Sequence, residues 1–400
     1  MQSRDATLET AESFLPDDGL RGTLLGRAWL PASITGTVAG PAPVWLREDG
    51  VYDLSTIRPT MAELLAEDPL GQLTTASLAG PVVTVRELIA NSIAPDPDPD
   101  LPRLLAPVDL QAIKACGVTF ACSLLERLIE ERAGGKPQLA EEIRAQLVDK
   151  LGTDLGSIVP GSEQADALKK LLVEQGLWSQ YLEVGIGPYA EVFTKAQPLS
   201  AVGLGQAVGI NPVSKWNNPE PEVVLIVDPE ANIVGASLGN DVNLRDIEGR
   251  SALLLGKAKD NNAACSIGPF IRLIDGTFSI DDIRNEKIRL EIHGIDGYEL
   301  TDNSDMSLIS RDVTDLVAQT INASHQYPDG LALFTGSLFA PSEDRDEPGM
   351  GFTHHIGDVV AISSPHLGRL QHPVCYCNDA PPWTFGVSAL IRNIAARELR

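Results

Sequence analysis

The sequence predicts an α+β protein in which a mixed β core carries a helical insertion and follows a small, β-containing N-terminal domain. From residue 183 onward, short β-branched and apolar runs alternate with Gly and Pro, which is typical of strands and turns. Between residues 123 and 180, apolar residues recur near i, i+3, i+4 and i+7, which indicates helices. The order of strands and helices is too irregular for a doubly wound sheet, and no Gly-rich phosphate loop follows a strand.

The first hundred residues form the expected N-terminal domain. They are rich in Pro and Gly, and short apolar runs at 40–45 and 81–85 favour strands. The segment 94–100 alternates Pro with Asp, so that no helix can persist there and a stiff, extended linker is expected. We therefore divide the chain into a small domain, 1–104, and a catalytic domain, 105–400.

In the second domain a strand precedes three helices, further strands follow, and two helices close the domain. Ser162 suits the N-terminus of the third helix, because Gln164 and Asp166 occupy its first turn. The expected strands are 113–119, 222–227, 233–238, 288–295, 331–334 and 359–362. The expected helices are 123–132, 138–151, 163–175, 312–323 and 387–400.

The charge of the chain limits its partners. The sequence holds 31 Lys and Arg against 55 Asp and Glu, a formal net charge of −24. Nucleic acids and anionic membranes are bound by clustered Lys and Arg, so we expect neither as a partner. No apolar run approaches the ~20 residues of a membrane span, and none at the start is typical of a signal peptide. A small anionic substrate stays compatible with this charge, because one divalent metal ion can reverse the local field.

The five cysteines are too few and too unevenly spaced for a disulfide framework: Cys116, Cys122, Cys265, Cys375 and Cys377. We therefore expect reduced thiols and a cytoplasmic protein. Cys375 and Cys377 could bind a soft metal, although no second pair follows at the spacing of a zinc site.

Two glutamates at the entry to a β-branched run are the most informative chemical signal. Glu220 and Glu222 project to the same face of an extended chain, about 7 Å apart. Asp241 follows the strand 233–238 and a Gly-Asn turn, so a hairpin-like return brings it back beside the pair. Like charges this close are unfavourable without a cation, and three hard oxygen ligands suit Mg²⁺ or Mn²⁺ better than Zn²⁺. The alternative interpretation is a solvated strand edge.

Five motifs in the same order resemble those of the fumarylacetoacetate hydrolase superfamily. In chain order they are a glycine-led loop at 117–120, Glu-x-Phe-x-Lys at 191–195, a core signature with Pro-Glu-Pro-Glu at 219–222, Gly-Asn-Asp-Val-x-x-Arg-Asp at 239–246 and Lys259, Thr-Gly at 335–336, and a closing Gly-Asp strand at 352–362. The resemblance covers about residues 105–370. It implies a mixed β roll, consistent with the β-rich texture of the second domain.

The resemblance also implies a site and a substrate class. It implies Mg²⁺, with Mn²⁺ as an alternative, held by Glu220, Glu222 and Asp241, and a small anionic 2-keto acid as substrate. Glu191 and Lys259 match the catalytic element of the family, so we expect them to be the proton-transfer pair, and which of them takes the substrate proton stays open. A metal ion beside Lys259 would lower its pKa. The expected substrate-binding residues are Phe120, Ser123, Lys195, Ser266 (in an expected turn at 266–269) and Thr335. Family members assemble at least as dimers, so we expect a homodimer or a higher homo-oligomer.

Within the family, the closest resemblance is to the branch that dehydrates 2-keto-3-deoxy sugar acids. Hydrolases of the family activate water with a His–Glu dyad, but the first histidine here is His293, beyond Asp241. The dehydratase branch shares the Gly-Val-Thr loop and the Lys before Ser-Ile-Gly-Pro, whereas Phe120 and Ala121 replace its usual Tyr and Arg. The leading expectation is therefore a Mg²⁺-dependent dehydratase that converts a 2-keto-3-deoxy-pentonate, such as 2-keto-3-deoxyarabinonate, to 2,5-dioxopentanoate in non-phosphorylative pentose catabolism.

Three alternatives stay open. The first is hydrolysis of an acylpyruvate or a 2,4-diketo acid, which would need a histidine beside the metal. The second is a binding protein without turnover, and the third is a zinc or redox protein built on Cys375 and Cys377. His354 and His355 are adjacent on a strand and face opposite sides, so one site cannot use both. Arg245 is expected to pair with an acid and to brace the loop after Asp241.

Overall fold

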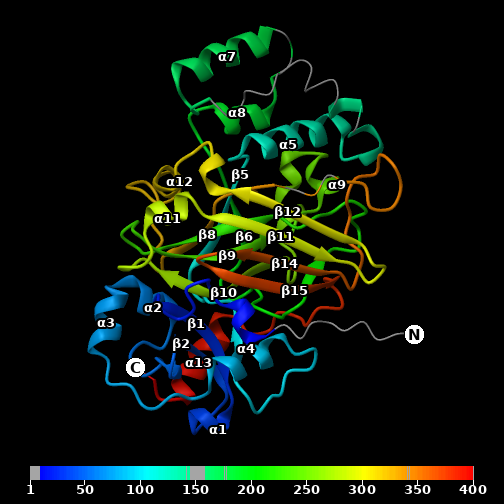
Figure 1. Cartoon of the computed structure of the whole chain (residues 1–400). Helices are drawn as coiled ribbons and strands as arrows, with labels where there is room; N and C mark the ends of the chain where they lie inside the picture. Colours follow the sequence, from blue (N-terminus) through cyan, green and yellow to red (C-terminus); the bar gives the residue numbers. More distant parts are fainter. Residues whose placement is uncertain are drawn as a thin grey trace.

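The computed structural model describes residues 10–140, 142–144, 158–174, 176, 178–339, 341 and 343–399. Its strands form two mixed sheets (Figure 1). The larger sheet has the order β3-β2-β1-β10-β9-β8-β13-β5-β6, with β4 paired to β1. Its strands are β1 (Leu24–Leu30), β2 (Gly40–Arg47), β3 (Gly50–Asp53), β4 (Arg103–Leu105), β5 (Ala112–Gly117), β6 (Glu191–Ala196), β8 (Pro221–Val227), β9 (Ile233–Asp241), β10 (Cys265–Leu273) and β13 (Leu331–Phe334). Within it, β13 and β5 are parallel and the other pairs are antiparallel.

The smaller sheet covers one face of the larger one. It has the order β12-β11-β14-β15-β7, with the strands β7 (Val208–Ile210), β11 (Lys287–His293), β12 (Glu299–Asp305), β14 (Val359–Ser364) and β15 (Gly368–Tyr376). The main core lies between the two sheets, where Val223 and Leu225 of β8 join a buried cluster with Ile362 of β14. The neighbouring residues Val224 and Ile226 point to a second core on the other face of β8. A strand that is buried on both faces reads as a continuous β-branched run, which explains the sequence at 222–227.

The helices lie at the edges and on the outer surfaces of this two-sheet core (Figure 1). The helices and 3₁₀ turns are η1 (Ala11–Phe14), α1 (Ala32–Thr35), α2 (Met61–Ala66), α3 (Pro69–Thr75), α4 (Val85–Ile93), α5 (Ala121–Ala133), η2 (Pro137–Leu139), α7 (Glu163–Glu174), α8 (Gln180–Ile186), α9 (Arg245–Glu248), η4 (Ala252–Leu254), α10 (Leu255–Lys259), α11 (Ile280–Arg284), η5 (Met306–Leu308), α12 (Val313–Thr320) and α13 (Val387–Ala396). In the described part of the chain, no helix is both long and apolar enough to cross a bilayer.

The predicted helical insertion forms a separate layer at one end of the molecule, where α7 and α8 stand above α5 (Figure 1). Its own apolar cluster joins Leu128 of α5, Leu172 of α7 and Leu182 of α8. The expected helices at 123–132 and 163–175 are confirmed as α5 and α7. The expected helix at 138–151 falls partly outside the described residues.

The N-terminal strands extend the sheet of the second segment. β1 pairs with β10 through Leu24 opposite Arg272 and Leu25 opposite Ile271. The end of the chain also returns to this region, since Asn393 Nδ2 in α13 donates to the Ala39 carbonyl at 2.8 Å. The division at residue 104 stays a prediction, with a hydrogen-bonded sheet running across it.

Two local expectations are wrong. Residues 81–85 form no strand: Val83 makes one isolated bridge to Val51, and Val85 already begins α4 behind a Thr84 capping box. The expected turn at 266–269 instead lies inside β10, where the strand register shifts between Gly268 and Arg272. Gly and Pro are typical of turns, but here they accompany an irregularity inside a buried strand.

Candidate active site

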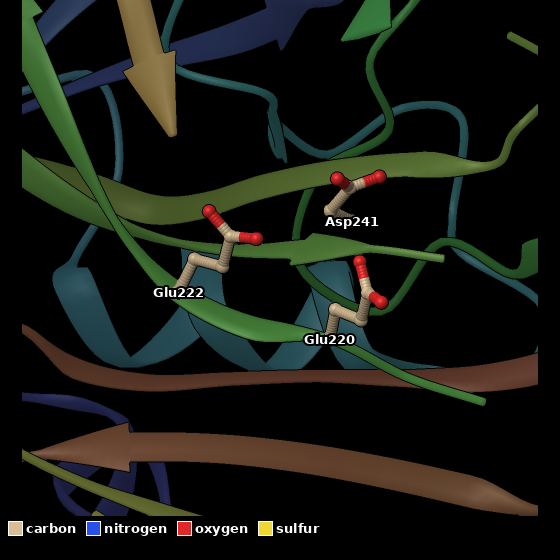
Figure 2. A group of neighbouring side chains, drawn as sticks. All are labelled: Glu220, Glu222 and Asp241. Atoms are coloured by element: carbon tan, nitrogen blue, oxygen red, sulfur yellow. The ribbon is translucent and has the colours of Figure 1, made fainter. Parts of the chain in front are cut away.

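Three carboxylates meet at the open end of the β8–β9 hairpin (Figure 2). Glu220 immediately precedes β8, Glu222 lies within it, and Asp241 ends β9. The Asp241 backbone N–H donates to the Glu220 carbonyl at 2.9 Å, which fixes the two chains side by side. One oxygen of each carboxylate lies within 4.8 Å of the others, and each residue is 1% exposed. The interpretation of these acids as a solvated strand edge is therefore wrong.

The donor set fits a hard divalent cation. Within the described ranges, this is the one group of three or more potential ligating side chains close enough to share an ion. Burial and the neighbouring charges of Asp241 and Glu220 raise the pKa of Glu222 well above its ordinary value. The Gly336 N–H (2.7 Å) and the Ser337 hydroxyl (3.3 Å) hold the Glu222 carboxylate in place. Mg²⁺ or Mn²⁺ takes oxygen ligands of this kind and would remove the like-charge repulsion.

Two lysines neutralise part of the cluster. Lys259 Nζ donates to Glu220 and lies 3.1 Å from Asp241 Oδ2. Burial disfavours the charged lysine, but Asp241 and Glu220 outweigh burial and raise the pKa of Lys259. The lowered pKa expected from the sequence requires a metal ion beside this lysine; the carboxylates by themselves give the opposite direction.

The ammonium group of Lys195 makes three contacts with other groups of the protein. Its Nζ lies 2.7 Å from Asp241 Oδ1 and donates to the carbonyls of Val242 (3.1 Å) and Lys259 (2.7 Å). The side chain is fully buried, so it supports both Asp241 and the backbone that carries the second lysine. A substrate contact through Nζ would require one of these three contacts to be given up.

Glu191 lies at the start of β6, opposite Gly117 at the end of β5. A Cβ atom at Gly117 would lie 2.1 Å from Glu191 Oε2, so the missing side chain makes room for the carboxylate. Burial raises the pKa of Glu191, while the charges of Arg127 and Lys259 partly offset this effect. Both members of the expected proton-transfer pair are therefore within electrostatic reach of the cluster.

The glycine-led loop and the Thr-Gly turn meet beside Glu222. Thr119 Oγ1 donates to the Thr335 carbonyl at 2.7 Å, and the Thr335 hydroxyl donates to the Val223 carbonyl at 3.0 Å. Gly336 has φ +102°, and a Cβ there would lie 2.0 Å from Thr119 Oγ1. The turn therefore needs glycine at this position, because a Cβ would meet the Thr119 hydroxyl and the positive φ is strained for other residues.

The other expected substrate ligands are placed differently. Phe120 is buried in the main core. Ser123 Oγ accepts the Phe120 N–H at 3.3 Å, which caps α5, and donates to the Phe120 carbonyl at 2.8 Å. Ser266 pairs with Asn240, whereas Cys265 pairs with Asp241. Side chains alternate along a strand, so Ser266 faces the side of the sheet opposite to Asp241. Its hydroxyl is buried and has no hydrogen-bond partner among the described residues.

Sequence reasoning missed an ionic network behind the cluster. Arg127 of α5 donates to Glu220 Oε1, and its other terminal nitrogen contacts Glu130 (2.5 Å) and Glu248 (3.0 Å). Burial raises the pKa of Glu248 to about 7. A signal existed: Arg127 and Glu130 are three residues apart on a predicted helix that directly follows the glycine-led loop. The expected pairing of Arg245 with acids is confirmed, because it contacts Glu126 (2.8 Å) and Glu130 (2.6 Å).

The histidines serve other contacts. His354 Nδ1 lies 3.3 Å from Asp358, whereas His355 contacts Asp296 and Asp346, so the two rings point to different partners. His372 Nε2 lies 2.8 Å from Asn240 Nδ2, on the face of β9 opposite to Asp241. Burial lowers the pKa of His372 to about 3. The metal cluster itself consists of carboxylates alone.

The cysteine pair forms no metal group. Cys375 and Cys377 are free, half-buried thiols. Burial and the neighbouring Cys375 raise the pKa of Cys377 to about 11, which is unlike a reactive or metal-binding thiolate. Among the described side chains, neither sulfur belongs to a cluster of ligands.

Sequence comparison finds dehydratases. No protein-family model matches the chain. It is 29% identical over 190 residues to the 2-dehydro-3-deoxy-D-arabinonate dehydratase of Saccharolobus solfataricus. This match covers 46% of this chain and 58% of that protein. It is also 29% identical over 201 residues to a probable 2-keto-3-deoxyxylonate dehydratase of Haloferax volcanii, covering 50% of this chain and 65% of that protein. The chain thus spans less than two thirds of the length of either relative.

Structure comparison extends the likeness to most of the chain. The apo form of 2-keto-3-deoxy-D-arabinonate dehydratase superposes with a TM-score of 0.60 at 18% identity, covering 88% of this chain and 99% of that one. The same coverage is found for that enzyme complexed with magnesium and 2,5-dioxopentanoate (TM-score 0.58, 17% identity). It is found again for fumarylacetoacetate hydrolase from Exiguobacterium antarcticum (TM-score 0.53, 16% identity). The predicted fold class is confirmed. The chain therefore has the fold of these structures, and in sequence it is similar to the 2-dehydro-3-deoxy-D-arabinonate and 2-keto-3-deoxyxylonate dehydratases.

Proposed function

We propose that this chain is a Mg²⁺-dependent dehydratase that converts a 2-keto-3-deoxy-pentonate, such as 2-keto-3-deoxyarabinonate, to 2,5-dioxopentanoate in pentose breakdown. The carrying observation is a buried trio of carboxylates with a lysine in contact and Glu191 within electrostatic reach. The relatives named as dehydratases, one of them solved with magnesium and 2,5-dioxopentanoate, support the substrate class. A cytoplasmic location and a homo-oligomeric state stay predictions.

A divalent cation at the carboxylates would favour an anionic ligand. Glu220, Glu222 and Asp241 are contacted by Arg127, Lys195 and Lys259. Glu130 and Glu248 offset the charge of Arg127. A 2-keto acid supplies one negative charge as its carboxylate and gains a second as an enolate, so the two positive charges of a bound divalent cation would stabilise the enolate more than the ketone.

The elimination step of the proposed reaction needs two proton transfers, and a tautomerisation follows. Bound Mg²⁺ would polarise the substrate's keto group and make the protons on C3 more acidic. One member of the Glu191–Lys259 pair removes a proton from C3, and the other protonates the hydroxyl that leaves C4 as water. The unsaturated product then loses a proton from C5 and gains one at C3, and the resulting C4=C5 enol takes up a proton at C4 and releases its hydroxyl proton to give the aldehyde. Overall, one water is released and no oxidant is required. Lys259 is buried, whereas Glu191 is half-buried, so bulk water has limited access to the pair.

Among the described residues, no histidine joins the carboxylate group as the hydrolase alternative would require. Carbon–carbon bond hydrolysis needs a group that activates water beside the metal. His372 contacts Asn240, the neighbour of Asp241 in β9, but this contact lies on the opposite face from Asp241. The geometry therefore supports dehydration over hydrolysis.

A substrate panel tests the proposal. Metal-free protein, with Mg²⁺ and then with EDTA, would be given both enantiomers of 2-keto-3-deoxypentonate and one acylpyruvate. We expect Mg²⁺-dependent 2,5-dioxopentanoate from one enantiomer, measured through an aldehyde dehydrogenase. Loss of acylpyruvate absorbance without aldehyde formation would instead establish the hydrolase. No turnover of any of these substrates would favour a binding protein without catalytic activity.

Adding a single methyl group at Gly117 should test the role of Glu191. We expect Gly117→Ala to lower turnover by about 10²-fold, the cost of misplacing a reacting group by ~1 Å. The new Cβ would meet Glu191 Oε2, the far end of a flexible side chain, so the melting temperature should change little. Steady-state kinetics and thermal unfolding measure the two effects.

A double-variant comparison provides the control. In a Glu191→Ala background the carboxylate is gone, so adding Gly117→Ala should cost no further activity. Equal losses from Gly117→Ala in both backgrounds would show that the methyl group acts elsewhere, and parent-like turnover in Glu191→Ala would remove Glu191 from the mechanism.

A further inference from the structure

The helical insertion reaches the metal cluster through one side chain, Arg127. This residue lies in α5, which packs directly beside α9 in Figure 1. One terminal nitrogen, Nη2, donates to Glu220 Oε1, while Lys259 donates to Glu220 Oε2. Both oxygens of this carboxylate are therefore held, one from the insertion and one from the β core.

The other end of the guanidinium is fixed independently of the cluster. Arg127 Nη1 contacts Glu130 Oε2 at 2.5 Å and Glu248 Oε2 at 3.0 Å. Glu130 is held in turn by Arg245, whose Nε lies 2.6 Å from Glu130 Oε1. The Arg245 guanidinium stacks on the Trp216 ring, 4.4 Å from its centre. Arg127 is thus a planar fork between a rigid support and Glu220, a geometry that lysine cannot reproduce.

The charges of this support decide whether Arg127 would oppose a metal ion. A lone guanidinium beside a divalent cation would repel it. Glu130 and Glu248 together carry two negative charges against the single positive charge of Arg127 when both are ionised, so the support is not net positive. Without Arg127, the buried acids Glu220 and Glu248 would lose their shared counter-ion, and the Glu220 carboxylate would keep a single contact among the described residues, from Lys259 to Oε2, about which it could turn.

We propose that Arg127 is a positioning residue that holds Glu220 in its metal-binding orientation, and that the helical insertion thereby forms part of the metal site. The inference rests on the proposed function only through the presence of a divalent metal at Glu220, Glu222 and Asp241. It assigns to α5 a role in metal affinity. A purely structural ion pair would instead contribute to stability and leave metal affinity unchanged.

Direct metal binding to Arg127→Gln tests the proposal without substrate. We expect the affinity for Mn²⁺, measured on the metal-free full chain from the electron paramagnetic resonance signal of free Mn²⁺, to fall by about 10- to 100-fold. The Mg²⁺ concentration for half-maximal activity should rise by a similar factor, with kcat at saturating Mg²⁺ largely kept. Arg127→Lys should recover part of the affinity, because it restores the charge but not the fork.

A second variant separates positioning from folding. Arg127→Gln combined with Glu248→Gln removes the carboxylate left without its partner and should restore stability, yet Mn²⁺ affinity should stay low. Lys169→Gln is the matched control, because Lys169 pairs with Glu183 inside the same insertion and touches no cluster residue in the described part of the chain. Parent-like Mn²⁺ affinity in Arg127→Gln, or an equal loss in Lys169→Gln, would overturn the proposal.

The two proposals fail in different ways. Parent protein that binds no Mn²⁺ would overturn the metal assignment and this inference with it. Parent protein that binds Mn²⁺ but dehydrates no 2-keto-3-deoxypentonate would overturn the proposed function alone, and Arg127→Gln would still be read by its Mn²⁺ affinity.

Discussion

Glu222→Gln is expected to abolish metal-dependent turnover while making the metal-free protein more stable. Glu222 is buried between Asp241 and Glu220, whose charges, together with burial, raise its pKa. Glutamine keeps the volume and can still accept the Gly336 N–H, but it removes one of three repelling charges. The same change removes a charged metal ligand, so Mn²⁺ affinity should fall by more than the ~10–100-fold cost of losing an outer partner.

Thermal unfolding with and without Mg²⁺ measures the stability of the metal-free protein and the stabilisation that metal binding adds. The parent should gain stability on adding Mg²⁺, by about 2.7 kcal/mol when the ion is at 100 times its Kd, whereas the variant should gain none. Glu286→Gln is the matched control: Glu286 is equally buried but is bound by Ser364 and His366. If Glu222→Gln keeps Mg²⁺-dependent stabilisation, the three carboxylates are not the metal site.

Lys259→Met should separate metal binding from chemistry. We expect turnover to fall by about 10²–10⁴-fold, the usual contribution of a positioned acid or base. Metal binding should be retained or tightened, because the substitution removes a positive charge that contacts Glu220 and Asp241. The linear apolar side chain of Met fills the buried space left by the lysine stem.

Kinetics at saturating Mg²⁺, together with direct Mn²⁺ binding, check this result. Lys257→Met is the control, since Lys257 lies on the same short helix but is exposed to solvent. A near-normal rate in Lys259→Met would remove this lysine from the mechanism. Loss of Mn²⁺ binding in Lys259→Met would show instead that the lysine holds the ligands in place.

The local sequence was sufficient wherever one element decides the outcome. The alternation of side chains places Glu220 and Glu222 on one face, and a single short hairpin returns Asp241 to them, which is the observed arrangement. Helical periodicity at 163–175 likewise predicts α7, because its polar and apolar faces are set by residues within one helix.

Local sequence patterns do not predict contacts between segments that are far apart in the chain. Arg127 and Glu220 are 93 residues apart, and nothing in either local pattern encodes that α5 would dock on the carboxylate. The face chosen by Ser266 depends on its pairing with Asn240, because a shift of one residue in register exchanges the faces of a strand. Helical spacing identifies the side of α5 on which Arg127 and Glu130 lie, but not the surface that receives them.

By itself, the sequence therefore determined the carboxylate trio, the β-rich core with its helical insertion, and a resemblance that points to one superfamily. Only the tertiary structure decided that β1 joins the same sheet as β10, that Lys195 is spent on Asp241 and on backbone carbonyls, and that Arg127 brings the insertion to Glu220. The reason is physical: periodicity and hairpins follow from neighbouring residues. Sheet pairing, burial and ion-pair partners follow from which distant surfaces lose water together.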